Sequence, residues 1–313
     1  MSHNSTPKVV LVTGCTTGGI GFHLCEEFAE KGCIVYATSR RLETMQGFRH
    51  DTIRAMALDV TRDEDISAVV QKILEERGKI DIVVNNAGAL AIGTYKSGCP
   101  FLVFTLGLVR SKSIPLMRSM YDAPGPVAEA TIEQMRNAFE LNTFAALRII
   151  NAIVPSMIER REGLIINIGS IAGIITTPWN TLYCAAKAAL HSITEGLSME
   201  LRPFGIKVML VAPGGVKSNI SKNQALTFKL PPTSHYTEYE ERLIERMNLA
   251  ANKDSMPTDA FAREVVANAL ATSPPPYISL GWNTWKVYIS QWLPRQYVLG
   301  QMYKAMVWKN KPA

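Results

Sequence analysis

The chain contains 313 residues, of which 47% are hydrophobic and 19% are charged, enough to bury a sizeable core in one α/β domain with appendages. Its net charge of +6 favours anionic partners, such as phosphorylated substrates or anionic lipid surfaces. The basic residues are spread out and form no nucleic-acid-binding motif, so we expect no nucleic-acid partner. The five cysteines show no metal-type spacing, which indicates a reducing compartment and no metal centre.

No apolar run reaches the roughly 18 residues that a membrane-spanning helix needs, and the polar N-terminus lacks a signal-peptide core.

The first predicted elements are a strand and a helix near the N-terminus. The apolar run Val9 to Val12 predicts a buried parallel strand, and residues 22–29 repeat apolar positions at helical spacing. Between them lies a turn with the glycines Gly14, Gly18, Gly19 and Gly21. Such a turn lets backbone amides approach a pyrophosphate at the helix N-terminus, so the pattern predicts a dinucleotide site.

The residues after the second predicted strand indicate which dinucleotide is bound. That strand, in "CIVYAT", is followed by Ser39, Arg40 and Arg41. An NAD site usually places an acidic residue here, whereas a basic residue suits the 2′-phosphate of NADP. We therefore expect NADPH rather than NADH. Asp59, after a third apolar stretch, is expected to reach the adenine edge.

Three more strands are expected further along the chain. A fourth, in "IDIVVNNAGAL", carries Asn85, Asn86, Ala87 and Gly88 at its carboxyl end, where open parallel sheets bind ligands. A long helical pattern covers 131–161, and "GLIINIGS" and "IKVMLVAPGG" predict the fifth and sixth strands. The alternation of strands and helices predicts an α/β fold, a doubly wound parallel sheet of Rossmann type with helices on both faces.

Tyr183 and Lys187 stand four residues apart in a helical pattern and therefore share one helix face. An ammonium beside a tyrosine lowers the pKa of its hydroxyl and makes it a better proton donor to a carbonyl oxygen. Ser170 would hold that oxygen in place. His191 lies on the same face as Tyr183, and we expect it to serve packing rather than chemistry.

In this order the motifs resemble those of the short-chain dehydrogenase/reductase family over residues 8–225. The matching pieces are TGCTTGGIG (13–21), LDV (58–60), NNAG (85–88), Asn142 in "FELNTFAAL", Ser170, YCAAK (183–187) and PGGVKS (213–218). The resemblance implies that Tyr183 is the acid/base, that Lys187 lowers its pKa and holds the nicotinamide ribose, and that Ser170 orients the carbonyl. Asn142 would support a water-linked proton relay.

The resemblance also implies a set of NADPH contacts, in which Ser218 stands where the family often has threonine. They are Gly14, Thr16, Gly18, Gly19, Ile20, Gly21, Ser39, Arg40, Arg41, Asp59, Val60, Asn86, Ala87, Gly88, Tyr183, Lys187, Pro213, Gly214, Val216 and Ser218.

Within the family, "TGCTTGGIG" and "YATSRRLETM" look like fungal NADPH-dependent 1-acyldihydroxyacetone-phosphate reductases. This implies a lipid ketone as the substrate, and the cytosolic face of the endoplasmic reticulum or a lipid droplet as the location, with the cytoplasm as the alternative. A steroid, retinoid or other hydrophobic ketone reductase is the nearest rival. A non-catalytic cofactor-binding protein is the rival from another class. Analogy with the family also suggests a homo-oligomer that pairs through the helices after strands four and five.

Three regions depart from a minimal domain, although we expect 1–313 to form a single domain. Residues 94–125 lengthen the stretch between Asn85 and Asn142, and are either a retained intron or a genuine insertion that touches membrane. Residues 217–260 are expected to form a substrate lid, with a plain surface excursion as the alternative. The extension 273–313 holds four of the five tryptophans, interleaved with tyrosines and basic residues. That composition favours contact with a membrane or lipid-droplet surface, while a cap over the substrate pocket or a dimer contact is the alternative.

Overall fold

The computed structural model describes residues 6–88, 125–217, 230–248 and 252–308. Its centre is a seven-stranded sheet in the order β3-β2-β1-β4-β5-β6-β7, in which all neighbouring strands are parallel. The strands are β1 (Val9–Thr13), β2 (Ile34–Ser39), β3 (Ile53–Ala57), β4 (Ile82–Asn85), β5 (Gly163–Ile168), β6 (Ile206–Pro213) and β7 (Tyr277–Leu280). The order reverses between β1 and β4, and such a switch point is where a doubly wound sheet binds ligands.

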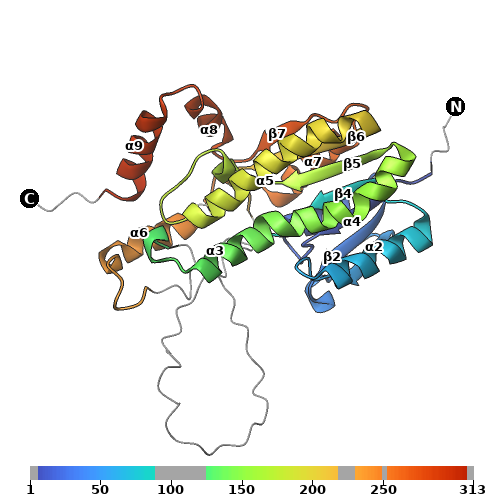
Figure 1. Ribbon diagram of the computed structural model, residues 1–313, viewed down its shortest axis with the longest axis horizontal. Coiled ribbons are helices and arrows are strands. Elements are labelled where there is room, and N and C mark those ends of the chain that lie inside the picture. The colour runs from blue at the N-terminus through green and yellow to red at the C-terminus, as the bar shows by residue number, and fades with distance from the viewer. Residues whose placement is uncertain (1–5, 89–124, 218–229, 249–251, 309–313) are drawn as a thin grey trace, which may run out of the picture.

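Helices cover both faces of this sheet, as the sequence predicted (Figure 1). They are α1 (Ile20–Glu30), α2 (Asp63–Arg77), α3 (Ile132–Phe139), α4 (Ala145–Arg160), α5 (Thr181–Glu200), α6 (Glu240–Asn248), α7 (Thr258–Ala269), α8 (Thr284–Ser290) and α9 (Arg295–Met306). Short 3₁₀ turns cover 42–44, 127–129, 171–173, 202–204 and 237–239. The doubly wound α/β fold is therefore confirmed.

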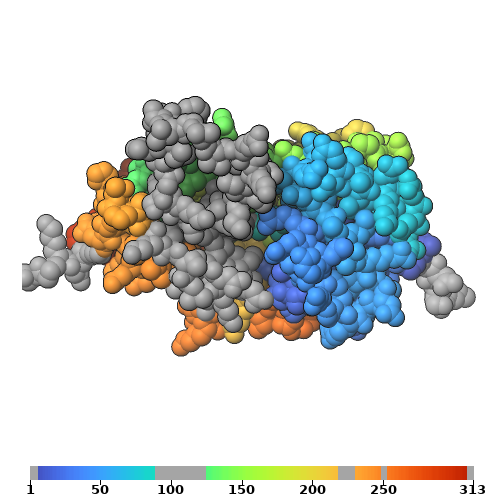
Figure 2. Space-filling model, turned by 90° about the horizontal axis from the view of Figure 1, so that it is seen from below, coloured from blue at the N-terminus to red at the C-terminus, as the bar shows by residue number. Residues whose placement is uncertain are grey.

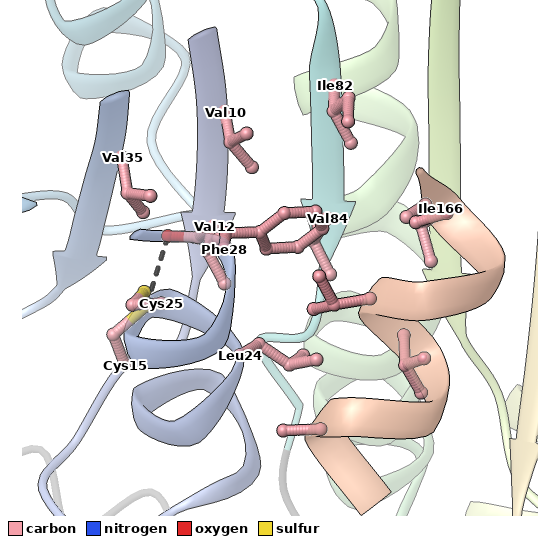
Figure 3. Packing of buried hydrophobic residues seen from close by; sticks show 14 of the residues in the cluster. Val10, Val12, Cys15, Leu24, Cys25, Phe28, Val35, Ile82, Val84 and Ile166 are labelled. Carbon is pink, nitrogen blue, oxygen red and sulfur yellow. Dashed lines mark hydrogen bonds between the residues drawn. The ribbon is translucent and has the colours of Figure 1, made fainter. Parts of the chain in front are cut away.

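Two cores hold the layers together, one on each face. On one face α1 and α7 pack against the central strands, with Phe28 and Phe261 fully buried. Figure 3 shows this packing around Val10, Val12 and Val84, together with the hydrogen bond from Cys15 Sγ to the Val12 carbonyl oxygen. On the other face α2 and α4 pack against the same strands. Because strands buried on both faces need apolar side chains throughout, the runs in β1 and β4 are uninterrupted.

The predicted helix over 131–161 is present as α3 and α4, joined by the π-turn η4 (Glu140–Phe144). Thr131 begins it with a capping box: its hydroxyl accepts the backbone N–H of Gln134, and the Gln134 side chain accepts that of Thr131. Among the described residues, Ile132–Arg160 is the one helix long and apolar enough to cross a membrane, a test that buried core helices also pass. Its α4 half packs in the second core.

The expected C-terminal extension differs from the prediction in its first part, because residues 277–280 form β7 beside β6. Only the later part, α8 and α9, lies outside the sheet, at one end of the molecule (Figure 1). Likewise, residues 258–260 of the expected lid begin α7, a helix of the core rather than of a lid. The expected insertion follows β4, and it lies outside the described residues apart from Gly125.

We call residues 230–248 together with 282–308 the cap. A small apolar cluster of Trp179, Leu230, Leu243 and Met247 joins it to the loop before α5, with Val307 packed against that cluster. Trp179 Nε1 also donates to the carbonyl oxygen of Met306 at 3.1 Å. In Figure 2 the N-terminal elements (blue to cyan) and the α6 region (orange) form opposite ends of one face.

Candidate active site

The glycine turn between β1 and α1 is locked to the end of β4. Asn86 Nδ2 donates to the carbonyl oxygens of Thr13 and Gly14 at 2.9 and 3.0 Å. The Thr13 hydroxyl accepts the backbone N–H groups of Asn86 and Ala87 at 3.1 and 3.0 Å. Gly14 has φ +74°, and a Cβ there would lie 2.8 Å from Ala87 Cα, so this position requires glycine. Two motifs far apart in the sequence therefore form one rigid edge.

The donors at this edge fit NADPH. Gly19 precedes α1 without a side-chain cap, so the first backbone N–H groups of the helix are left for an anion such as a pyrophosphate. Thr16 is exposed on the turn, and its carbonyl oxygen accepts the Gly19 N–H at 2.9 Å. Arg40 and Arg41 are exposed just after β2, and two guanidinium groups suit a 2′-phosphate.

The other predicted cofactor contacts lie at the same edge of the sheet. The Asp59 carboxylate accepts the backbone N–H and hydroxyl of Thr61 at 3.0 and 2.7 Å, which fixes the turn after β3, and Val60 is buried beside it. Ser39 pairs its hydroxyl with that of Thr44 at 3.0 Å. Ile20 begins α1 and is partly buried against the first core.

The loop after β6 is held by the C-terminal part of the chain. Gly214 N–H donates to the Leu280 carbonyl oxygen at 2.8 Å, and Gly215 N–H donates to that of Trp282 at 2.9 Å. A Cβ on Gly214 would collide with the Trp282 backbone, so this approach also requires glycine. Val216 bridges to Met256. Pro213, Gly214 and Val216 therefore stand together, whereas Ser218 lies outside the described residues.

The structure brings the four predicted catalytic residues to the carboxyl ends of β4 and β5. Ser170 follows β5, and its hydroxyl accepts the Ala172 N–H at 3.1 Å and acts to lower the pKa of Tyr183. The Lys187 ammonium lies 5.8 Å from the centre of the Tyr183 ring. It also donates to the Ile168 carbonyl oxygen at 2.8 Å.

Asn142 lies in the π-turn η4, a distortion that recurs at functional sites. Its Nδ2 donates to the Ala138 carbonyl oxygen at 3.0 Å. A Cβ built on Gly88 would stand 3.0 Å from Asn142 Oδ1 and 3.6 Å from Lys187 Nζ. The end of β4, the π-turn and α5 therefore converge on one point.

The expectation of a lowered pKa for Tyr183 is wrong for the side chains as they lie here. Removal from water raises the pKa of Tyr183 to about 12, because it penalises the tyrosinate, while the hydrogen bond with Ser170 acts in the opposite direction. Burial likewise lowers the pKa of Lys187 to about 8. A tyrosine that keeps its proton at neutral pH is in the right state to donate it to a carbonyl oxygen, so the site suits reduction.

His191 makes a hydrogen bond to the site that the sequence did not predict. Its Nε2 accepts the Ser170 backbone N–H at 3.3 Å. Burial, and secondarily the Lys187 charge, lower the pKa of His191 to about 4, so the imidazole is neutral and can accept this bond. Its position eight residues after Tyr183 on the same helix face was the one signal in the sequence.

Arg246 is a second residue that the sequence pattern did not single out. Its guanidinium reaches Thr177 from the cap, and its charge lowers the pKa of Tyr183 against the larger effect of burial.

Comparison with known proteins places this geometry in a family. The model of the short chain dehydrogenase family matches residues 8–105 and 116–227, so 106–115 within the expected insertion is left unmatched. The NADPH-dependent 1-acyldihydroxyacetone phosphate reductase of Saccharomyces cerevisiae is 31% identical over 280 residues, which are 87% of this chain and 82% of that protein.

Solved structures agree with this placement. A short-chain dehydrogenase from Streptomyces avermitilis is 27% identical, with a TM-score of 0.72 over 96% of this chain and 98% of that one. A Burkholderia cenocepacia short chain dehydrogenase in complex with NADP is 22% identical, with a TM-score of 0.66 over 95% and 97% of the two chains, and shares the fold. The chain therefore belongs to the short-chain dehydrogenase family and is an oxidoreductase.

Proposed function

We propose that this protein reduces 1-acyldihydroxyacetone phosphate to 1-acylglycerol 3-phosphate. The observation that carries the reaction type is the position of the Lys187 ammonium, 5.8 Å from the centre of the Tyr183 ring, with Ser170 at the end of the neighbouring strand β5. The name of the S. cerevisiae relative, at 31% identity, supports the substrate. The net charge of +6 suits the phosphate of such a substrate.

The chemistry divides simply among the groups of the site. NADPH supplies the hydride that the ketone carbon receives. The Ser170 hydroxyl holds the carbonyl oxygen, and Tyr183 gives its phenolic proton to that oxygen as negative charge develops there. The Lys187 ammonium beside the ring stabilises the tyrosinate that is left. Solvent then returns the proton to Tyr183.

The test is NADPH oxidation by the purified chain with three ketones: 1-acyldihydroxyacetone phosphate, its dephosphorylated analogue and a steroid ketone. Preference for the lipid ketones over the steroid supports the proposal, and preference for the steroid replaces it with the rival activity. No turnover of any ketone, together with intact NADPH binding, identifies a non-catalytic cofactor-binding protein. A version lacking residues 94–125, assayed beside it, tests whether that segment is a retained intron, in which case the deletion raises activity.

We further propose that the outer face of the cap contacts a lipid surface, on the endoplasmic reticulum or a lipid droplet. Trp292 is 79% exposed, and the other exposed aromatics of the cap alternate with Lys286 and Lys304. Aromatic rings interleaved with basic residues favour the membrane–water interface. Its inner side is engaged with protein, because Val298 is buried and Arg295 donates to the Ile174 carbonyl oxygen at 3.2 Å.

Flotation with anionic liposomes tests this contact. Replacing Trp285, Trp292 and Tyr297 together by serine is expected to release the protein, whereas serine at the exposed Met199 of α5 is the matched control. Equal binding by both variants would refute the contact. A fluorescent fusion of the same two variants then asks whether the endoplasmic reticulum and droplet signal becomes cytoplasmic.

A homo-oligomer through α4 and α5 is also proposed, by analogy with the family. Exposed Phe144, the last residue of η4 and directly before α4, supports it. Light scattering of the wild type and of a Phe144→Glu variant tests it, since only an oligomer built on these helices would dissociate.

A further inference from the structure

Arg246 reaches the edge of the active site from α6 of the cap. Its Nε and Nη2 donate to the Thr177 hydroxyl at 3.1 and 2.9 Å. Thr177 belongs to the loop between Ser170 and α5, and its hydroxyl lies 3.7 Å from the Cys184 sulfur, which neighbours Tyr183 in the chain. The guanidinium is therefore fixed at the loop that leads from Ser170 to α5, and its charge acts on Tyr183.

This guanidinium is half-buried without a compensating carboxylate. Burial lowers the pKa of Arg246, and Cys184 and Tyr183 act in the opposite direction. Within the described ranges, no ion pair joins Arg246 to an acidic side chain. A cation removed from water without a counter-ion is costly, and at a ligand site the missing anion comes from the ligand.

Three acidic groups in and around the cap have partners other than Arg246. Glu240 accepts the Leu230 backbone N–H at 3.1 Å, and Glu245 pairs with Arg242 at 2.9 Å. Glu129, which contacts the cap from the other side, accepts the hydroxyl of Ser234 at 2.6 Å. None of these bonds neutralises Arg246, so the positive charge stays available to a ligand.

The same helix is anchored by apolar packing. Leu243 and Met247 are buried in the cluster with Trp179, one on either side of Arg246 in the sequence. This packing fixes the part of α6 that carries the Arg246 guanidinium.

We propose that Arg246 binds the phosphate of the substrate and thereby selects phosphorylated lipid ketones over neutral ones. This inference rests on the proposed function. In the substrate, one methylene and one ester oxygen separate the ketone carbon from phosphorus, so the phosphate-binding cation must stand beside the group that protonates the carbonyl. Thr177 takes two of the five N–H donors of the guanidinium, which leaves donors for a bidentate bond to phosphate.

The test compares Arg246→Gln with the wild type on 1-acyldihydroxyacetone phosphate and on its dephosphorylated analogue. A charge-assisted bond of this kind predicts a loss of about 10- to 100-fold in kcat/KM for the phosphorylated ketone. The neutral ketone should lose much less, because it misses only the effect of the Arg246 charge on Tyr183. Arg246→Lys should recover part of the loss, because it keeps the charge without the fork. Arg242→Gln, one turn earlier on α6 and paired with Glu245, is the matched control and should leave both rates unchanged.

A second measurement separates this inference from the proposed substrate. At saturating NADPH, 1-acylglycerol 3-phosphate is added as a competitor of neutral ketone reduction. Competition that Arg246→Gln abolishes supports the phosphate site even if 1-acyldihydroxyacetone phosphate is not turned over, in which case the proposed function alone fails. Two outcomes would overturn the role of Arg246. The Arg246→Gln variant could keep both rates, and with them the preference for the phosphorylated ketone. It could also lose the same factor in rate on both ketones, which would indicate an effect on Tyr183 itself.

Discussion

The edge of the sheet and the cap are built by different kinds of contact. At the edge, backbone groups and short polar side chains interlock, as in the bonds between Asn86 and the Thr13–Gly14 turn. In the cap, large side chains pack on one another, as Trp179 does on Tyr236 and Tyr239 at ring-centre distances of 5.9 and 5.6 Å. The first arrangement tolerates little change, whereas the second can be remodelled by substituting side chains. We therefore expect the edge to fix the reaction and the cap to set the substrate preference.

The largest expected effect is at the edge. Tyr183→Phe removes the proton donor while keeping the ring, so kcat for ketone reduction should fall by about 10²- to 10⁴-fold. NADPH binding, followed by fluorescence titration, should stay within a few-fold of the wild type. A mutant that retains its rate would show that the proton comes from another group, and the proposed division of roles would then be wrong.

The cofactor preference comes next in size. Replacing Arg40 and Arg41 together by alanine should raise KM for NADPH by about 10- to 100-fold, since charge-assisted bonds to the 2′-phosphate are lost. NADH, which lacks that phosphate, should be used as well as before. The ratio of kcat/KM for the two cofactors measures this directly, and an unchanged ratio would mean that the arginines are only surface charges.

Several features of the edge could be predicted from sequence because their signals are local. The glycine turn, the residues after β4 and the pair Tyr183 and Lys187 each lie within a short window. Their convergence follows from the parallel order of the strands, since the carboxyl ends of parallel strands share one edge.

The features that escaped prediction depend on contacts between distant parts of the chain. The strand β7 and its hydrogen bond with Gly214 come from residues whose sequence pattern predicts an aromatic tail. The sequence does not distinguish Arg246 from other charged residues of a helix, because its contact with Thr177 is visible only in the structure. The direction of the Tyr183 pKa was mistaken for the same reason, because desolvation depends on how much protein surrounds the phenol.

The pH dependence of the reduction rate tests the electrostatics of the edge. We expect its effect to be smaller than those of the Tyr183 and arginine substitutions and larger than that of His191. The pKa of Lys187 is lowered from 10.5 to about 8, so the ammonium is present below that pH and is lost as pH rises through it. Without the ammonium, the tyrosinate left after proton transfer is not stabilised. The rate of reduction should therefore be constant below pH 8 and fall about tenfold per pH unit above it. A pH–kcat profile measures this, and a rate that stays level to pH 10 would contradict the role given to Lys187.

The smallest expected effect concerns His191, which supports Ser170 without touching the substrate. His191→Leu removes the acceptor of the Ser170 N–H, and a lost hydrogen bond of about 1 kcal/mol corresponds to a roughly fivefold lower kcat with little change in KM. His191→Gln, whose side-chain oxygen can accept the same N–H, should recover part of that rate. Because the pKa of His191 is held near 4, neither the wild type nor the Gln variant should show a limb near pH 6.5. If the Leu and Gln variants lose the same rate, His191 acts through packing alone and Ser170 is positioned by other contacts.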